Sequence, residues 1–155
     1  MKNHCMIIDD NALVRETAAT LVRHIAGCQV RCCSDGQEAL RVFAEEPGAF
    51  GWVITDFNMP GMTGLELGGR LRALAPDVKM LLMTGNPGAV DHGAMRDQGF
   101  HGVLPKPFNL SVLRDAIGSF FPLPGNVIPA AAPRGSFEGR FTFYEKSSVP
   151  VCAAA

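Results

Sequence analysis

The chain has 155 residues, 47% of them hydrophobic, which is enough for one small domain with a full core. Its 14 basic and 15 acidic residues are interspersed and leave a net charge of −1, so the composition gives no reason to expect binding to nucleic acid or to an anionic membrane. No apolar stretch approaches the roughly 20 residues that span a bilayer, and Asp9 and Asp10 interrupt the first apolar segment too early for a secretion signal. Five cysteines without C-x-x-C spacing are typical of reduced thiols. We therefore expect a cytoplasmic protein that does not insert into membranes.

Five short apolar runs predict the strands of a sheet. Each run has the length of a buried strand, and turn residues or a helical pattern follow it. The runs cover residues 4–9, 30–33, 52–56, 78–83 and 102–105.

Amphipathic helical patterns follow these runs. The residues that cap four of the predicted helices are Asn11, Asp35, Thr63 and Asn109. Asp35 and Thr63 are each followed three residues later by a glutamate, which is a capping-box pattern. The remaining helix, over 88–98, is weak because Gly93 interrupts it. This strict alternation predicts an α/β fold in which five helices cover both faces of a five-stranded parallel sheet.

Polar side chains arrive at the carboxyl ends of four of the predicted strands. Asp9, Asp10 and Asp56 are three acids that repel one another unless a cation lies among them or one is protonated. Carboxylates are hard oxygen ligands that suit Mg²⁺. Thr84 and Lys106 bring a hydroxyl and an ammonium group to the same edge, where open parallel sheets bind their ligands. This constellation indicates phosphoryl chemistry.

Four segments, in order along the chain, carry a resemblance to a known family. They are the pair Asp9-Asp10, the block TDFNMPGMTGLEL at 55–67, the pair Thr84-Gly85 and the triplet Lys106-Pro107-Phe108. In these motifs, residues 1–121 resemble the receiver domain of two-component response regulators. They are similar to the stand-alone chemotaxis regulator of that family. The resemblance implies a flavodoxin-like, doubly wound sheet with strand order 2-1-3-4-5.

The resemblance also implies a role for each residue at the acidic edge. Asp56 would be the phosphoacceptor, and a phosphohistidine on a sensor histidine kinase or a histidine phosphotransfer protein would be the donor. Asp10 and Asp56 would bind Mg²⁺ directly, together with the backbone carbonyl of Asn58, whereas Asp9 would act largely through water. The protein would be no conventional enzyme, although it would assist its own phosphorylation and dephosphorylation. It would signal by binding a protein target or by passing the phosphoryl group onward, as a monomer or weak dimer.

The formal charges support a metal independently. Three carboxylates and Lys106 leave the edge at −2, which repels a phosphoryl donor, and Mg²⁺ would make it neutral. In the family, the residue at Lys106 neutralises oxygens of the transferring group. Thr84 would bind the new phosphoryl oxygen and draw its loop inward, so that a local event changes a distant surface.

Each motif taken alone also has an ordinary structural explanation. Asp10 can assist a helix start, Thr84 before a glycine can be turn chemistry, and Lys106-Pro107 can be a strand exit, although the family has a cis peptide there. A Mg²⁺-dependent phosphohydrolase of the haloacid-dehalogenase type is a second hypothesis. It requires a second acid two residues after the nucleophile, where Asn58 stands.

A third hypothesis is an interaction module that works without phosphorylation. The family usually carries Tyr or Phe three positions before the lysine, and Val103 stands there. In the family this aromatic couples phosphorylation to the surface formed by the fourth helix, the fifth strand and the fifth helix.

The resemblance ends near residue 121. Residues 122–135 are rich in proline and alanine and are typical of a linker. Alternating aromatic and polar residues at 137–144 favour a short strand, and a disordered tail is the equal alternative. Because few residues follow, we expect no DNA-binding output domain.

Overall fold

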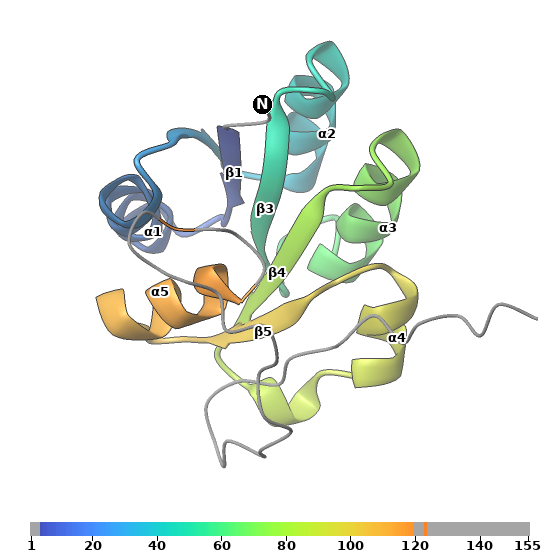
Figure 1. Cartoon of the computed structure of the whole chain (residues 1–155). Coiled ribbons are helices and arrows are strands. Elements are labelled where there is room, and N and C mark those ends of the chain that lie inside the picture. Colours follow the sequence, from blue (N-terminus) through green and yellow to red (C-terminus); the bar gives the residue numbers. More distant parts are fainter. Residues whose placement is uncertain (1–3, 120–122, 124–155) are drawn as a thin grey trace, which may run out of the picture.

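The computed structural model of the protein describes residues 4–119 and Leu123, and Figure 1 shows their arrangement. The strands are β1 (His4–Ile8), β2 (Gln29–Cys33), β3 (Phe50–Asp56), β4 (Lys79–Thr84) and β5 (Gly102–Pro105). The helices are α1 (Ala12–Ala26), α2 (Gly36–Glu45), α3 (Gly64–Leu74), α4 (His92–Asp97) and α5 (Leu110–Gly118), with a short 3-10 helix η1 (Pro87–Ala89) before α4. The predicted strand at 137–144 and most of the predicted linker lie outside the described residues.

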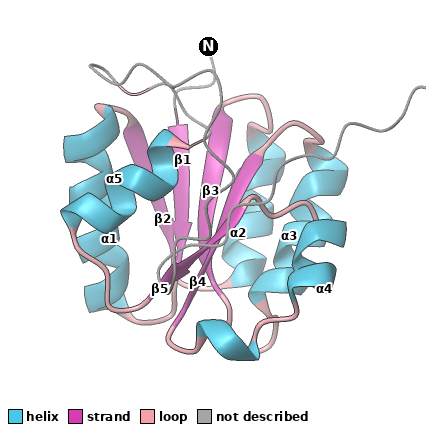
Figure 2. Ribbon diagram, turned by 60° about the horizontal axis from the view of Figure 1, so that its bottom comes forward, coloured by secondary structure: helices cyan, strands magenta, loops and turns pink. Residues whose placement is uncertain are grey.

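The strands form one sheet in the order β2-β1-β3-β4-β5, and every pairing is parallel. Helices α1 and α5 cover one face of the sheet, whereas α2, α3 and α4 cover the other (Figure 2). The strand β1 is flanked by β2 on one side, and β3, β4 and β5 follow in order on its other side. The predicted doubly wound, flavodoxin-like α/β fold is therefore confirmed. Within the described part of the chain, no helix is long and apolar enough to cross a membrane.

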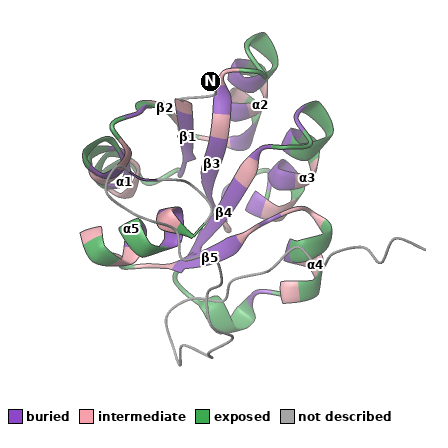
Figure 3. Cartoon of the chain, viewed as in Figure 1, coloured by how far each residue is buried: buried purple, intermediate pink, exposed green. Residues whose placement is uncertain are grey.

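The alternation of side chains along each strand divides the core into two layers. On β1, Met6 and Ile8 pack with residues of α2, α3 and α4, whereas Cys5 and Ile7 pack with residues of α1 and α5. The second layer also contains Trp52, which is fully buried. Each large side chain buried in this way stabilises the fold by about 1.5–3 kcal/mol. Figure 3 shows the result, with buried strands at the centre and exposed outer faces on the helices.

Side-chain caps fix the starts of α2 and α3. At α3 the predicted capping box is complete, because Thr63 Oγ1 accepts from the Glu66 N–H at 3.2 Å and Glu66 accepts from the Thr63 N–H at 2.8 Å. At α2, Asp35 accepts from the Glu38 N–H at 2.8 Å, but the Glu38 carboxylate turns to Ser34 instead of Asp35. Ser34 offers it two donors, the backbone N–H at 2.7 Å and the hydroxyl at 3.0 Å. The second capping box is therefore only half formed.

The predicted helix over 88–98 is confirmed only in part, because its start and its point of interruption differ in the structure. The segment forms η1, a short extended stretch at the buried Val90, and then α4. The break lies at Asp91, whose carboxylate accepts from the N–H groups of Gly93 and Ala94 at 2.8 and 3.0 Å and so caps a new helix. Gly93 lies inside the first turn of α4 and does not interrupt it.

Candidate functional site

The carboxyl ends of four strands bring the predicted polar residues to one edge of the sheet. These residues are Asp9 directly after β1, Asp56 at the end of β3, Thr84 at the end of β4 and Lys106 directly after β5. Because the strands are parallel and adjacent, all four residues reach the same edge. It lies beyond the carboxyl ends of the strands, beside the point where the strand order reverses, which is where ligands of such sheets bind.

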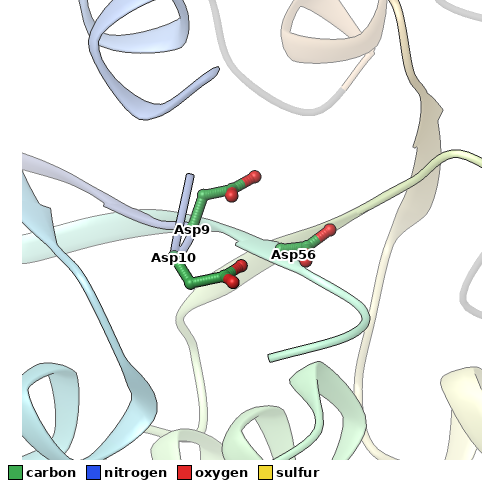
Figure 4. Close-up of side chains that lie close together, drawn as sticks. All are labelled: Asp9, Asp10 and Asp56. Atoms are coloured by element: carbon green, nitrogen blue, oxygen red, sulfur yellow. The ribbon is translucent and has the colours of Figure 1, made fainter. Parts of the chain in front are cut away.

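Three carboxylates form a cluster at this edge. One oxygen from each of Asp9, Asp10 and Asp56 lies within 4.8 Å of the other two. Figure 4 shows the three side chains gathered beside the ends of β1 and β3. Asp9 is fully buried and Asp56 is 6% exposed, whereas Asp10 is exposed to solvent. Among the described residues, this is the one group of acids, histidines or cysteines close enough to hold a metal ion.

Lys106 joins two of the three acids. Its Nζ lies 2.7 Å from Asp56 Oδ1 and 2.9 Å from Asp9 Oδ2, so one ammonium group serves two carboxylates. The backbone N–H of Lys106 donates to the carbonyl of Thr84 at 2.7 Å, which fixes the exit of β5 against the end of β4. The peptide bond from Lys106 to Pro107 is cis, as the resemblance implies.

The carboxylates of Asp9 and Asp10 differ in their hydrogen-bond and ion-pair partners. Both Asp9 oxygens have partners, since Oδ1 accepts from the Asn11 N–H at 2.8 Å and Oδ2 accepts from Lys106. The carboxylate of Asp10 makes no hydrogen bond or ion pair within the described part of the chain. The hard oxygens of this cluster and the unused carboxylate of Asp10 fit a Mg²⁺ ion.

The local electrostatics favour an added cation. Burial raises the pKa of Asp56 above its usual range, and although Lys106 opposes this, the neighbouring Asp9 charge adds to it. Burial alone would lower the pKa of Lys106, but its hydrogen bonds to Asp56 and Asp9 outweigh burial and raise it. Lys106 therefore stays charged near neutral pH, while the ionised form of Asp56 is destabilised by burial and by the like charge of Asp9. A bound cation would relieve both effects.

Thr84 is buried, with 2% of its surface exposed. Its Oγ1 accepts from the Asn86 N–H at 3.1 Å, which is the turn chemistry that the sequence also allowed. This bond uses a lone pair of the hydroxyl and not its proton. The structural explanation and the functional one are therefore compatible for this side chain.

The loop after β3 carries Asn58 past the acidic edge. Its start is fixed because the Phe57 N–H donates to the Met83 carbonyl at 2.8 Å, and the Phe57 carbonyl accepts from the Gly64 N–H at 2.9 Å. A Cβ on Gly64 would collide with the backbone carbonyl oxygen of Asp56. Glycine is therefore required for α3 to begin directly against the peptide group of Asp56.

Arg15 belongs to the site although it was absent from the sequence prediction. Its Nη1 donates to the backbone carbonyl of Asp9 at 2.7 Å. The signal in the sequence is weak, namely a basic residue four positions after Asn11 and so one helical turn beyond the cap. With this second cation, the edge has a formal charge of −1 instead of −2.

Comparison with known proteins agrees with this geometry. The family model of the response regulator receiver domain matches residues 5–118. Chemotaxis protein CheY of Pseudomonas aeruginosa is 32% identical over 128 residues, which cover 75% of this chain and 94% of CheY. Response regulator protein FleR of the same organism is 40% identical over 114 residues, which cover 72% of this chain but only 23% of FleR.

The likeness extends to solved structures. The chemotaxis protein CheY4 of Vibrio cholerae superposes with a TM-score of 0.68 at 27% identity, over 76% of this chain and 98% of that one. The family match, these relatives and the sheet order agree with one another. The chain therefore belongs to the response regulator receiver domain family.

Proposed function

We propose that the chain accepts a phosphoryl group on Asp56 from a phosphohistidine, with Mg²⁺ bound at the acidic edge. The observation that supports this most is the arrangement around Lys106. One ammonium group holds Asp56 and the buried Asp9, while Asp10 presents an unused carboxylate to solvent in the same cluster. An edge with a nucleophile, a fixed cation and room for a second cation suits phosphoryl transfer.

In the proposed step, a carboxylate oxygen of Asp56 attacks the phosphorus of the phosphohistidine. The new P–O bond forms as the P–N bond breaks, and the imidazole leaves with the electron pair of that bond. Lys106 then pairs with an oxygen of the transferred group, and the Thr84 hydroxyl donates its free proton to another. Bound Mg²⁺, held by Asp10, Asp56 and the carbonyl of Asn58, with Asp9 acting through water, would neutralise the remaining negative charge.

The partners follow from this chemistry. The donor is a sensor histidine kinase or a histidine phosphotransfer protein, because the phosphoryl group comes from a protein histidine. The output is binding to a protein target or onward transfer of the phosphoryl group, by a cytoplasmic monomer or weak dimer. Val103, buried where the family usually has an aromatic, favours one further candidate, a receiver fold that binds its target without phosphorylation.

A small P–N donor tests the proposed step without a kinase. Incubation with phosphoramidate and Mg²⁺ is expected to give an adduct that hydroxylamine removes, since hydroxylamine cleaves acyl phosphates and leaves phosphoserine intact. Chelation of Mg²⁺ with EDTA should abolish the adduct. A hydroxylamine-resistant adduct would contradict an aspartyl phosphate, and sustained hydrolysis of p-nitrophenyl phosphate would favour the phosphohydrolase hypothesis.

A further inference from the structure

The backbone around Asp10 is held at three successive peptide groups, although its carboxylate has no protein partner among the described residues. The carbonyl of Asp9 accepts from Arg15 Nη1 at 2.7 Å. The N–H of Asn11 donates to Asp9 Oδ1 at 2.8 Å, and the carbonyl of Asn11 accepts from the backbone N–H of Arg15 at 3.0 Å. Arg15 therefore contacts the chain on both sides of Asp10, once through its side chain and once through its backbone.

The contact from the guanidinium group is the stronger of the two. It is a charge-assisted hydrogen bond to a carbonyl that belongs to the buried Asp9, and Arg15 is itself partly buried, so water competes weakly for either group. The rest of the β1–α1 connection depends on the Asn11 cap, whose side chain accepts from the N–H groups of Leu13 and Val14 at 3.0 and 3.2 Å. Without the guanidinium group, the carbonyl between Asp9 and Asp10 loses its partner.

We propose that Arg15 is a positioning residue that holds Asp10 in place to bind Mg²⁺; this inference rests on the metal site proposed above. Groups that orient metal ligands contribute strongly to metal affinity even though they never touch the ion. Arg15 also carries a positive charge, which by itself repels Mg²⁺. The positioning role and the charge thus have opposite effects on metal affinity. The direction in which Mg²⁺ affinity changes when Arg15 is replaced shows which of the two effects is larger.

The test is Mg²⁺ titration by calorimetry of the wild-type protein, Arg15→Met and Arg15→Lys. Arg15→Met keeps the length of the stem but removes the donor and the charge, and we expect roughly 10-fold weaker Mg²⁺ binding. Arg15→Lys keeps one donor and should recover part of that loss. Arg23→Met is the matched control, because it removes an exposed arginine near the other end of α1 and should leave Mg²⁺ affinity unchanged.

A second readout is independent of the metal. In Arg15→Met without Mg²⁺, hydrogen exchange at the Asn11 amide should accelerate while the amides of β4 keep their protection, which excludes global unfolding as the cause. Equal or tighter Mg²⁺ binding by Arg15→Met would overturn the positioning role alone. A wild-type protein that binds no Mg²⁺ would overturn the proposed metal site together with it.

Discussion

Replacement of Asp10 by asparagine is expected to weaken Mg²⁺ binding more than about 100-fold, whereas the same change at Asp9 should weaken it roughly 10-fold. Both substitutions keep the shape of the side chain and remove one negative charge, so they form a matched pair. They differ because the Asp10 carboxylate is exposed and has no partner among the described residues, while both Asp9 oxygens are occupied by Asn11 and Lys106. Calorimetric titration of both variants and the wild type with Mg²⁺ measures the difference.

Lys106→Met, the third variant in this series, should not weaken Mg²⁺ binding. It removes the cation that lies 2.7 Å from Asp56 and 2.9 Å from Asp9, so Mg²⁺ should bind as tightly as in the wild type or more tightly. Phosphorylation should nevertheless be impaired, because the cation that pairs with the transferred group is gone. Equal Mg²⁺ affinities for the wild type and all three variants would contradict the roles assigned to these residues.

A phosphoryl mimic such as beryllofluoride is expected to shift the amides of residues 84–99 more than those of α5. Val103 is buried in the layer beneath α2, α3 and α4 and is stiff at χ1, so it cannot make the excursion that an aromatic makes at this position in the family. The response must then pass through the Thr84 loop and η1. Because Arg72 Nη1 donates to the Asp97 carbonyl at 2.8 Å, the end of α4 is tied to α3, and the largest shifts should fall before it.

NMR shift mapping measures this response, with Asp56→Asn as the control that should show no shifts. Uniform, large changes along α5 in the wild-type protein would show that switching proceeds without the aromatic. In that case the inference drawn from Val103 would be wrong.

Most of the fold could be predicted because local signals and the hydrophobic pattern agree. The caps at Asn11, Thr63 and Asn109 each precede a helical pattern, and all three accept the expected backbone hydrogen bonds. The prediction for residues 88–98 had the wrong helix start and interruption because two signals compete there. Gly93 resembles a helix breaker in the sequence, but the Asp91 carboxylate accepts from the N–H of Gly93 and caps α4, which begins after η1 has ended.

The site was predictable in its residues but less so in its contacts. Asp9, Asp56 and Lys106 each follow or end a predicted strand. Because the carboxyl ends of parallel strands lie together, the three residues must reach the same edge of the sheet. The sequence cannot show that Lys106 pairs with Asp56 and Asp9 together, since that depends on the side-chain path from β5 across two strands. Nor could it single out Arg15, whose guanidinium acts through a backbone carbonyl instead of a charged partner.

Intact mass measurement after incubation with acetyl phosphate tests the central proposal most directly. In the presence of Mg²⁺, the wild-type protein is expected to gain one phosphoryl group, and the gain should disappear when EDTA removes the metal. Asp56→Asn, which keeps the size of the side chain but not the nucleophile, should gain none under the same conditions. An adduct that persists in Asp56→Asn, or a wild-type protein that gains no phosphoryl group with Mg²⁺ present, would contradict Asp56 as the phosphoacceptor.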